Sequence, residues 1–423
     1  MPRANRAWPG PIKDMTSAIQ CRSCGSALGA LILDLGIQPL ANNLLKEEDL
    51  SKPEPRFPLR LAVCETCWML QILDLVPPVQ LFSEYLYFSS FSDLMLRHAE
   101  AAASRYVQEF GLGKQSLVTE IASNDGYLLQ YFQKQGVPCM GIEPAANIAR
   151  VAREKGIETL VEFFGRELAL NLAAGSRKAD LILGNNVFAH APNPNDFVAG
   201  LAGLLKPEGR IILEFPYAAD FIEKNEFDTI YHEHVFYFSL SALVPLFARH
   251  GLSVFHVEHL PIHGGSLRLF AGIDGVHNVQ PSVAALLAEE HQKGMLGLAY
   301  YRGFADRVLN LKQSLVGLLS EFKRQSKTIA AYGASAKGST LLNFFGLGRG
   351  ELDFVVDRST YKQGRFTPGM HLPILAADEL LKRRPDYTLL LTWNFAEEIL
   401  EQQTAYRKQG GKFIIPIPQV KVD

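Results

Sequence analysis

The chain has 423 residues, of which 48% are hydrophobic and 20% charged, a composition typical of folded globular proteins. Its 42 basic and 44 acidic side chains nearly cancel, so no overall positive field attracts nucleic acid or an anionic membrane surface. No apolar run reaches the roughly 18 residues that a membrane helix requires, and we expect a cytoplasmic protein with two or three domains.

Residues 1–20 contain no hydrophobic signal core and are expected to form a flexible lead-in. Two CxxC pairs follow, at Cys21 and Cys24 and at Cys64 and Cys67. Each CxxC turn aims two sulfurs at one point, and two such turns complete the tetrahedral S₄ shell that zinc prefers. Redox dithiols or free buried thiols are alternatives, but neither pair lies in the βαβ context of a thioredoxin-like motif. A closed Cys₄ site leaves no position for substrate, so we expect a structural zinc in a module spanning 21–82.

The region 83–275 is expected to form an α/β domain. A helix is predicted over 93–110, and an apolar strand then ends at Glu120, followed by a polar loop and an amphipathic helix. A second strand ends at Glu143, and ADLILGNNVFAH and GRIILEFPY contain two more. Strands that alternate with helices predict a parallel, doubly wound, Rossmann-like sheet with a ligand at the carboxyl ends of the strands.

The loop EIASNDG of this domain is not the GxGxxG loop of a dinucleotide fold. Its carboxylates, Glu120 and Asp125, would repel a pyrophosphate but suit a cationic or hydroxyl-rich ligand. Glu143 stands where an acidic side chain binds two ribose hydroxyls. This pair favours S-adenosylmethionine (AdoMet), which has a ribose, a sulfonium and an ammonium but no phosphate; a generic polar cluster is the alternative. The predicted cofactor residues are Glu120, Asn124, Asp125, Gly126, Glu143, Pro144 and Asn185.

Residues 276–423 are expected to form a second Rossmann-like α/β domain. A long helical region over about 283–325 precedes TIAAYGASAKGSTLLNFF, which predicts a strand, a glycine loop and a helix. YGASAKGST lacks the GxxxxGK[ST] spacing of an NTP-hydrolysing loop, so an ATPase is rejected. Its amide groups and Lys337 still suit a diphosphate at the helix N-terminus, as do Arg358 and Lys362 after the next strand. A domain with only a scaffolding role is the alternative.

Several motifs together resemble one known family: the double CxxC, EIASNDGYLLQYF, GIEPAANIA, HAPNPNDFVAGL, FDTIYHEHVFYFSL, PIHGGSLRLF and GASAKGSTLLNFFG followed by DRSTYKQGRFTPGMHLPI. The chain is similar, over nearly all of its length after residue 20, to sugar C-methyltransferases that alkylate nucleotide-linked 4-keto-deoxysugars. The resemblance implies a zinc module, a central AdoMet domain and a C-terminal domain that helps to hold the nucleotide sugar.

The stretch YHEH suits the chemistry that this resemblance implies. Methyl transfer to carbon requires a carbanion-like nucleophile, and a 4-keto group acidifies the neighbouring C–H bond, so the enzyme needs a general base and donors to an enolate oxygen. Histidine, with an unperturbed pKa near 6.5, is a natural base, and tyrosine hydroxyls are suitable donors. The resemblance implies that Tyr231, Glu233 and His234 face the sugar, with His234 as base and His232 turned into packing.

Two other interpretations of YHEH remain open on the sequence alone. In a strand, His232 and His234 would share a face, and a third metal ligand could come from His190 or His263. The HExxH spacing of metalloproteases is absent, and the proposed methyl transfer needs no metal-assisted hydrolysis. Alternatively, the histidines are satisfied within the core and have only a structural role.

Further candidates lie in loops. The resemblance favours Tyr85 as a cover for the pocket, whereas Tyr87 is expected to pack; His190 follows the third strand and could orient AdoMet or substrate. The run from His263 to Ser266 offers backbone N–H groups to an anion. The predicted substrate residues are His263, Ser266, Lys337, Arg358, Lys362 and Asn394.

The sequence therefore predicts an AdoMet-dependent C-methyltransferase that acts as a monomer on a dTDP- or GDP-linked 4-keto-6-deoxysugar, at C3. Methylation at C5, or O- or N-methylation of a small metabolite, are the enzymatic alternatives. A non-catalytic zinc-bearing nucleotide-binding protein is the alternative from another class, and it would bind AdoMet without turnover.

Overall fold

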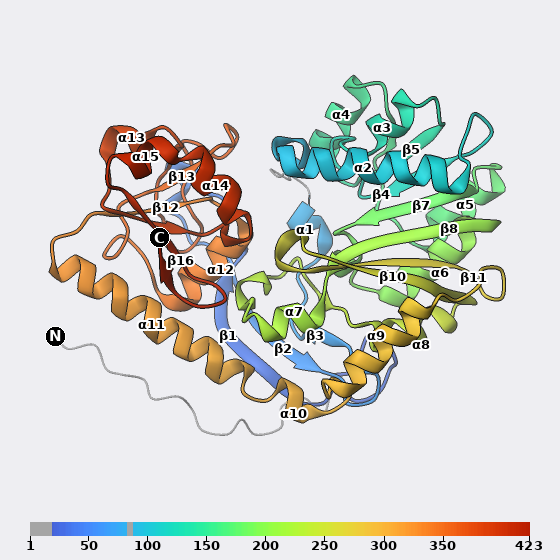
Figure 1. The fold of residues 1–423 in the computed structure, drawn as a ribbon, viewed down its shortest axis with the longest axis horizontal. Coiled ribbons are helices and arrows are strands. Elements are labelled where there is room, and N and C mark those ends of the chain that lie inside the picture. The colour runs from blue at the N-terminus through green and yellow to red at the C-terminus, as the bar shows by residue number, and fades with distance from the viewer. Residues whose placement is uncertain (1–18, 83–87) are drawn as a thin grey trace.

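The computed structural model of the chain describes residues 19–82 and 88–423. Two α/β lobes lie side by side, and the N-terminal module lies between and below them, with its long strand β1 (Leu31–Pro39) running between the lobes (Figure 1). No helix among the described residues combines the length and the apolar character needed to cross a membrane.

The N-terminal module is a four-stranded sheet that borrows one strand from far along the chain. Strand β1 pairs antiparallel with β2 (Arg56–Val63), which pairs with β3 (Leu70–Ile72). The free edge of β3 is closed by β9 (Phe236–Tyr237), also antiparallel, with Gln71 opposite Phe236. The segment that follows YHEH is thus part of the zinc module's sheet.

The central lobe contains a seven-stranded sheet of order β10-β11-β8-β7-β4-β5-β6. Its strands are β4 (Val118–Ile121), β5 (Cys139–Ile142), β6 (Glu158–Leu160), β7 (Ala179–Asn185), β8 (Leu205–Pro216), β10 (Leu252–Leu260) and β11 (Ser266–Ile273). The strands β4 to β8 are mutually parallel, as predicted, but β11 is antiparallel to both of its neighbours. The connection from β10 to β11, two strands for which no prediction was made, is too short for the crossover of a dozen or more residues that a parallel pair requires, so they pair antiparallel.

Helices cover both faces of this sheet, and β4 and β7 lie side by side where the strand order reverses, the switch point at which such sheets bind ligands. The helices of this lobe are α2 (Asp93–Phe110), α3 (Leu129–Lys134), α4 (Ala146–Glu154), α5 (Arg166–Ala174), α6 (Pro194–Leu204), α7 (Ala218–Glu223) and α8 (Leu240–Ala248). A short helix α1 (Pro78–Phe82) precedes them.

The C-terminal lobe has a six-stranded sheet of order β14-β13-β12-β15-β16-β17, parallel except for β17. Its strands are β12 (Ile329–Tyr332), β13 (Val355–Asp357), β14 (Ile374–Ala376), β15 (Tyr387–Leu390), β16 (Lys412–Ile415) and β17 (Lys421–Val422). The predicted helical region over 283–325 is three helices, namely α9 (Pro281–Gln292), α10 (Leu298–Tyr301) and α11 (Phe304–Arg324). The remaining helices are α12 (Ala336–Phe345), α13 (Glu379–Arg383), α14 (Ala396–Gln402) and α15 (Thr404–Lys408).

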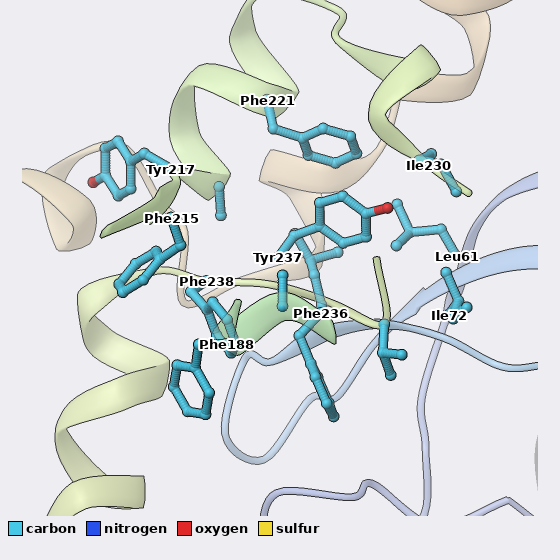
Figure 2. Close-up of a cluster of buried hydrophobic side chains, with 14 of the residues drawn as sticks. Leu61, Ile72, Phe188, Phe215, Tyr217, Phe221, Ile230, Phe236, Tyr237 and Phe238 are labelled. Atoms are coloured by element: carbon cyan, nitrogen blue, oxygen red, sulfur yellow. The ribbon is translucent and has the colours of Figure 1, made fainter. Parts of the chain in front are cut away.

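One hydrophobic core joins the module to the central lobe around β9 (Figure 2). Tyr237 stacks on Phe221 of α7, with ring centroids 4.6 Å apart, while Phe236 points to the other side of the strand. Leu61 and Ile72 of the module lie in the same cluster. Because truncation of a buried phenylalanine costs about 3–5 kcal/mol, this aromatic cluster holds β9 against both parts of the protein.

Candidate functional site

The four paired cysteines come together at one point of the N-terminal module. Their sulfurs all lie within 4.8 Å of one another, and the pairs Cys21–Cys67 and Cys24–Cys64 are each 3.6 Å apart. Four sulfurs at about 2.3 Å from a central zinc ion are about 3.8 Å apart. The donor set and its spacing therefore fit a closed tetrahedral zinc site.

The zinc site is connected to the rest of the protein by its neighbours. Gln71 of β3 donates through Nε2 to the Cys21 sulfur at 3.1 Å, and Gln71 is the residue that stands opposite Phe236 of β9. On the other side, Asn195 of α6 donates through Nδ2 to the carbonyl oxygens of Arg22 and Ser23, both at 2.9 Å. The first CxxC turn is thus fixed to the central lobe as well as to β3.

A cavity of about 700 Å³ lies at the carboxyl ends of the central strands and is lined by all three parts of the protein. The residues that face it and carry polar groups include Asn42 of the module, then Asn124, Glu143, Asn185, His190, Tyr231 and His234 of the central lobe, and Ser335, Lys337, Asp357, Lys362 and Asn394 of the C-terminal lobe.

The loop after β4 has a strained backbone that positions Glu143. Ala122 and Asn124 both have positive φ angles, 53° and 49°, which non-glycine residues rarely adopt. In this conformation the Asn124 amide donates to Glu143 Oε2 at 3.0 Å, and the Ala145 amide donates to Oε1 at 2.9 Å. Burial raises the pKa of Glu143 to about 7, although these two bonds oppose the rise.

The predicted cofactor residues separate into two groups. Asn124, Glu143, Pro144 and Asn185 line the cavity, whereas Glu120, Asp125 and Gly126 lie outside its lining.

The three residues outside the lining support the loop from behind. Asp125 accepts hydrogen bonds from Ser90 Oγ and, at 3.1 Å, from Lys155 Nζ. Gly126 has φ 77°, and a Cβ there would lie 2.3 Å from Ile157 Cδ1, so the tight turn and the close packing require glycine. Burial, together with the charges of Asp125 and Glu143, raises the pKa of Glu120 well above its usual value.

YHEH is a turn rather than a strand, so the shared strand face on which the two-histidine metal alternative depended is absent. The imidazole of His232 lies against the N-terminal module, with Nε2 3.1 Å from the Pro58 carbonyl oxygen and the ring 5.8 Å from that of Phe57. Within the described part of the chain, neither histidine belongs to a cluster of potential metal ligands. A metal centre at YHEH therefore finds no support.

His234 is held in one tautomer that leaves a basic nitrogen toward Tyr231. Nδ1 lies 3.0 Å from the carbonyl oxygen of Thr229, which can only accept, so Nδ1 carries the proton. Nε2 then has the lone pair, and the Tyr231 hydroxyl donates to it at 2.7 Å. The ring centroids of these two residues are 4.1 Å apart, and both line the cavity.

Two more polar residues surround this pair. Glu233 is outside the cavity lining, and its Oε1 accepts from Asn42 Nδ2 at 2.7 Å, so it reaches the cavity through Asn42. The His190 ring lies 4.8 Å from that of His234. Burial lowers the pKa of His190 to about 4, so it is uncharged at neutral pH.

The C-terminal lobe contributes a lysine that lies over a tryptophan ring and whose charge acts on two buried carboxyl groups. Lys337 Nζ lies 4.8 Å from the centre of the Trp393 ring, a cation–π distance. Trp393 Nε1 donates to Asp228 Oδ2 at 2.7 Å. Burial raises the pKa of Glu226 to about 7 and that of Asp228 to about 6, and the charge of Lys337 opposes both rises.

The other predicted substrate residues are more scattered. Lys362 lines the cavity, with Nζ donating to the Ala334 carbonyl oxygen at 2.8 Å, and Asn394 lines it as well. Arg358 lies outside the lining and is 3.6 Å from Glu398. Ser266 is buried at the start of β11 and donates to the Ile262 carbonyl oxygen at 3.1 Å.

Tyr85, with its neighbour Tyr87, lies outside the described residues, and the same holds for the side chain of His263.

Sequence reasoning did not single out Asn42, Thr229, Trp393 or Asp357. Asp357 had a signal, because it ends a predicted strand as Glu143 does. No local sequence pattern could have indicated Asn42, Thr229 or Trp393. Asn42 and Trp393 bind residues far away in the sequence, and Thr229 acts through its backbone carbonyl oxygen.

Comparisons with known proteins cover most of the chain. Three family models match: a zinc binding domain at residues 21–82, a methyltransferase domain at 95–257 and a C-methyltransferase C-terminal domain at 261–418. The C-methyltransferase NovU of Streptomyces niveus is 38% identical over 404 residues, which are 95% of this chain and 96% of the relative.

Two solved structures show a weaker likeness. Magnesium protoporphyrin IX methyltransferase of Synechocystis PCC 6803 with bound SAM is 15% identical, with a TM-score of 0.32, over 42% of this chain and 78% of that one. YcgJ protein from Bacillus is 16% identical, with a TM-score of 0.33, over 42% and 98% of the two chains.

The Cys₄ geometry predicts the effect of removing one sulfur. Cys64→Ser leaves an S₃ shell, and because zinc binding contributes to folding free energy, both zinc content and the thermal unfolding midpoint are expected to fall. Metal analysis and thermal unfolding of the purified variant measure the two quantities.

Cys139→Ser is the matched control, because Cys139 lies outside the cluster and its thiol donates to the Leu129 carbonyl oxygen instead. This variant should keep its zinc. A metal-free Cys64→Ser protein as stable and active as the wild type would contradict the structural role.

Proposed function

This chain belongs to the AdoMet-dependent C-methyltransferase family, and from that premise we propose that it methylates carbon C3 of a nucleotide-linked 4-keto-6-deoxysugar, with His234 as the base. The observation that carries the proposal is the Thr229–His234–Tyr231 arrangement, which presents a basic nitrogen and a phenol to a cavity shared by all three parts of the protein. Methylation at C5 of the same class of substrate is the alternative.

The first chemical step is removal of a proton from the carbon beside the ketone. When the Tyr231 hydroxyl turns to the ketone oxygen, the lone pair on His234 Nε2 is released to accept that proton. The electrons of the C–H bond form a carbon–carbon double bond, and negative charge moves to the oxygen, where Tyr231 donates a hydrogen bond. Thr229 keeps the imidazole in the required tautomer throughout.

Bound AdoMet supplies an electrophilic methyl group on its sulfonium. With AdoMet held by Asn124, Glu143 and Asn185, the nucleophilic carbon would take this methyl group while the sulfur keeps the electrons of the broken bond, and His234 would then return its proton to solvent. His190 is uncharged at neutral pH because burial lowers its pKa to about 4, so it does not oppose the positive charge that His234 gains. Asn42, whose side chain is held by Glu233, supplies a further polar group for the sugar hydroxyls.

The nucleotide part of the substrate is assigned to the C-terminal lobe. Lys337 and Lys362 bring two positive charges to the cavity near the N-terminus of α12, where amide groups favour a diphosphate. Thr340 of the same helix donates to the Ile230 carbonyl oxygen at 3.0 Å, immediately before Tyr231. This contact places α12 directly beside the turn that carries the base.

The substrate assignment is tested with AdoMet and a panel of dTDP- and GDP-linked 4-keto-6-deoxysugars. Mass spectrometry is expected to find a product heavier by one methylene, with the new carbon at C3 by NMR. A product methylated at C5 selects the alternative, and methylation only of hydroxyl or amino groups would remove the carbon-acid mechanism.

The base assignment predicts a large kinetic effect of His234→Asn. Asparagine keeps a polar group of similar size but cannot accept the proton, so methyl transfer should fall by at least about 10²-fold while both ligands still bind. In D₂O the wild-type enzyme should exchange the hydrogen at C3, and the variant should not.

The neighbouring His232→Asn serves as the control, because His232 faces the N-terminal module rather than the cavity. Its turnover and its rate of hydrogen exchange at C3 should stay within about tenfold of the wild-type values, a much smaller loss than removal of a base would cause. Turnover near the wild-type level in His234→Asn would contradict the assignment of His234 as the base and make His190 or Tyr85 the next candidates.

The environment of Glu143 predicts that AdoMet affinity depends on pH. Ribose hydroxyls donate to the charged carboxylate, whereas the pKa of Glu143 is raised to about 7 by burial before the ligand binds. Affinity should therefore rise with pH up to about 7 and level off above it, with up to about tenfold loss per pH unit below, because binding must release the proton. Calorimetric titration across this range measures the profile.

Glu143→Gln should bind AdoMet weakly and lose this pH dependence. Lys337→Ala is the complementary variant: it should weaken the nucleotide sugar and leave AdoMet affinity unchanged. A flat profile in the wild-type enzyme together with unchanged AdoMet affinity in Glu143→Gln would exclude Glu143 as the ribose ligand.

A further inference from the structure

The two α/β sheets share one strand order around their switch points. The central lobe runs β6-β5-β4-β7-β8, and the C-terminal lobe runs β14-β13-β12-β15-β16 in the same sense. In both lobes, the strand next to the central one leads into an acidic residue: Glu143 directly follows β5, and Asp357 ends β13.

The two carboxylates are also held in the same way. The Ala334 amide donates to Asp357 Oδ2 at 2.8 Å, and the Ser359 amide donates to Oδ1 at 2.8 Å. At Glu143 the equivalent donors are Asn124 and Ala145, at 3.0 and 2.9 Å. In each case one amide belongs to the loop after the central strand, and the other lies two residues beyond the carboxylate.

This arrangement leaves acceptor capacity on both oxygens. A carboxylate has about four lone-pair positions. The two amide bonds of Asp357 use one on each oxygen, and Lys362 Nζ lies 3.7 Å from Oδ2, an ion pair that is too long for a hydrogen bond. The Asp357 side chain keeps 13% of its surface exposed and lines the cavity. The proposed methyl transfer gives it no role, whereas its counterpart Glu143 is assigned to the ribose of AdoMet.

The adjacent loop has the features of a diphosphate site. Gly333 has φ 95°, and a Cβ there would lie 2.5 Å from Thr392 Cγ2, so the backbone turns tightly before α12. Ser335 caps the helix by accepting from the Gly338 amide at 3.1 Å, and Lys337 and Lys362 face the same cavity. In sheets of this order, a phosphate group at the helix N-terminus places the attached pentose beside the acidic residue of the neighbouring strand.

We propose that Asp357 accepts a hydrogen bond from the 3′-hydroxyl of the pentose in the nucleoside diphosphate part of the substrate. The inference rests on the proposed function, because it requires a nucleoside diphosphate at the C-terminal lobe. Both deoxyribose and ribose carry this hydroxyl; a ribose would engage the second oxygen of Asp357 through its 2′-hydroxyl. Asp357 would thus bind the pentose of the substrate in the way that Glu143 is proposed to bind the ribose of AdoMet.

The test combines one substitution with one change in the ligand. Thymidine 5′-diphosphate and its 3′-deoxy analogue are titrated calorimetrically into the wild-type protein and into Asp357→Asn. The wild type should prefer the 3′-hydroxyl ligand by about tenfold or more, as a hydrogen bond to a charged acceptor allows. The variant should bind both ligands with nearly equal affinity.

The ratio of affinities separates loss of this hydrogen bond from general damage to the loop. A distorted loop would weaken both ligands by the same factor and keep the preference, which would overturn the role of Asp357. Glu143→Gln is the matched control and should keep the full 3′-hydroxyl preference while it loses AdoMet affinity. Uridine and deoxyuridine diphosphates show whether the 2′-hydroxyl is held as well.

Failure of this inference can be told from failure of the proposed function. A wild-type protein that binds thymidine diphosphate equally well without its 3′-hydroxyl removes Asp357 as the pentose ligand and leaves the methyl transfer standing. A protein that binds no nucleoside diphosphate of either pentose overturns both.

Discussion

The pairing of the two-residue strand β9 with β3 determines where the base is placed. The amide of Ile72 donates to the Val235 carbonyl oxygen at 3.0 Å, and the Val235 amide donates to the Ala189 carbonyl oxygen at 2.8 Å, so the end of the YHEH turn lies between the zinc module and the central lobe. Because Gln71 contacts both the zinc site and β9, the metal stabilises the strand against which the turn is built.

The start of the same segment is held by the C-terminal lobe. Asp228 accepts from Trp393, and the neighbouring Thr229 carbonyl oxygen lies near two donors, His234 Nδ1 and the Tyr237 hydroxyl at 3.1 Å. The residue that fixes the histidine tautomer is therefore adjacent to one that contacts the indole lying under Lys337. Lys337, at the proposed diphosphate position, is therefore connected to the base by a short series of contacts. The series runs through Trp393, Asp228 and the adjacent Thr229 to His234.

Local patterns in the sequence predicted the parts that depend on neighbouring residues. The CxxC pairs, the acidic strand ends and the glycine loops each encode a turn or a strand end over a few residues, and the family relationship confirms the zinc and AdoMet predictions. The sequence could not predict β9, because two residues carry no periodicity. It also did not distinguish Glu143, which faces the cavity, from Asp125, which faces Lys155, because both are acidic residues in segments that follow neighbouring strands.

The borrowed strand has a consequence during synthesis of the chain. The three strands β1 to β3 leave the ribosome long before β9 has been made, so the nascent module has an unpaired β3 edge in the meantime. Open strand edges pair readily with other chains. Early capture of zinc by the four cysteines orders the module, yet only the arrival of Phe236 and Tyr237 closes its edge. A chain that stops before these residues would therefore carry a folded, metal-bound domain with a permanent site for aggregation.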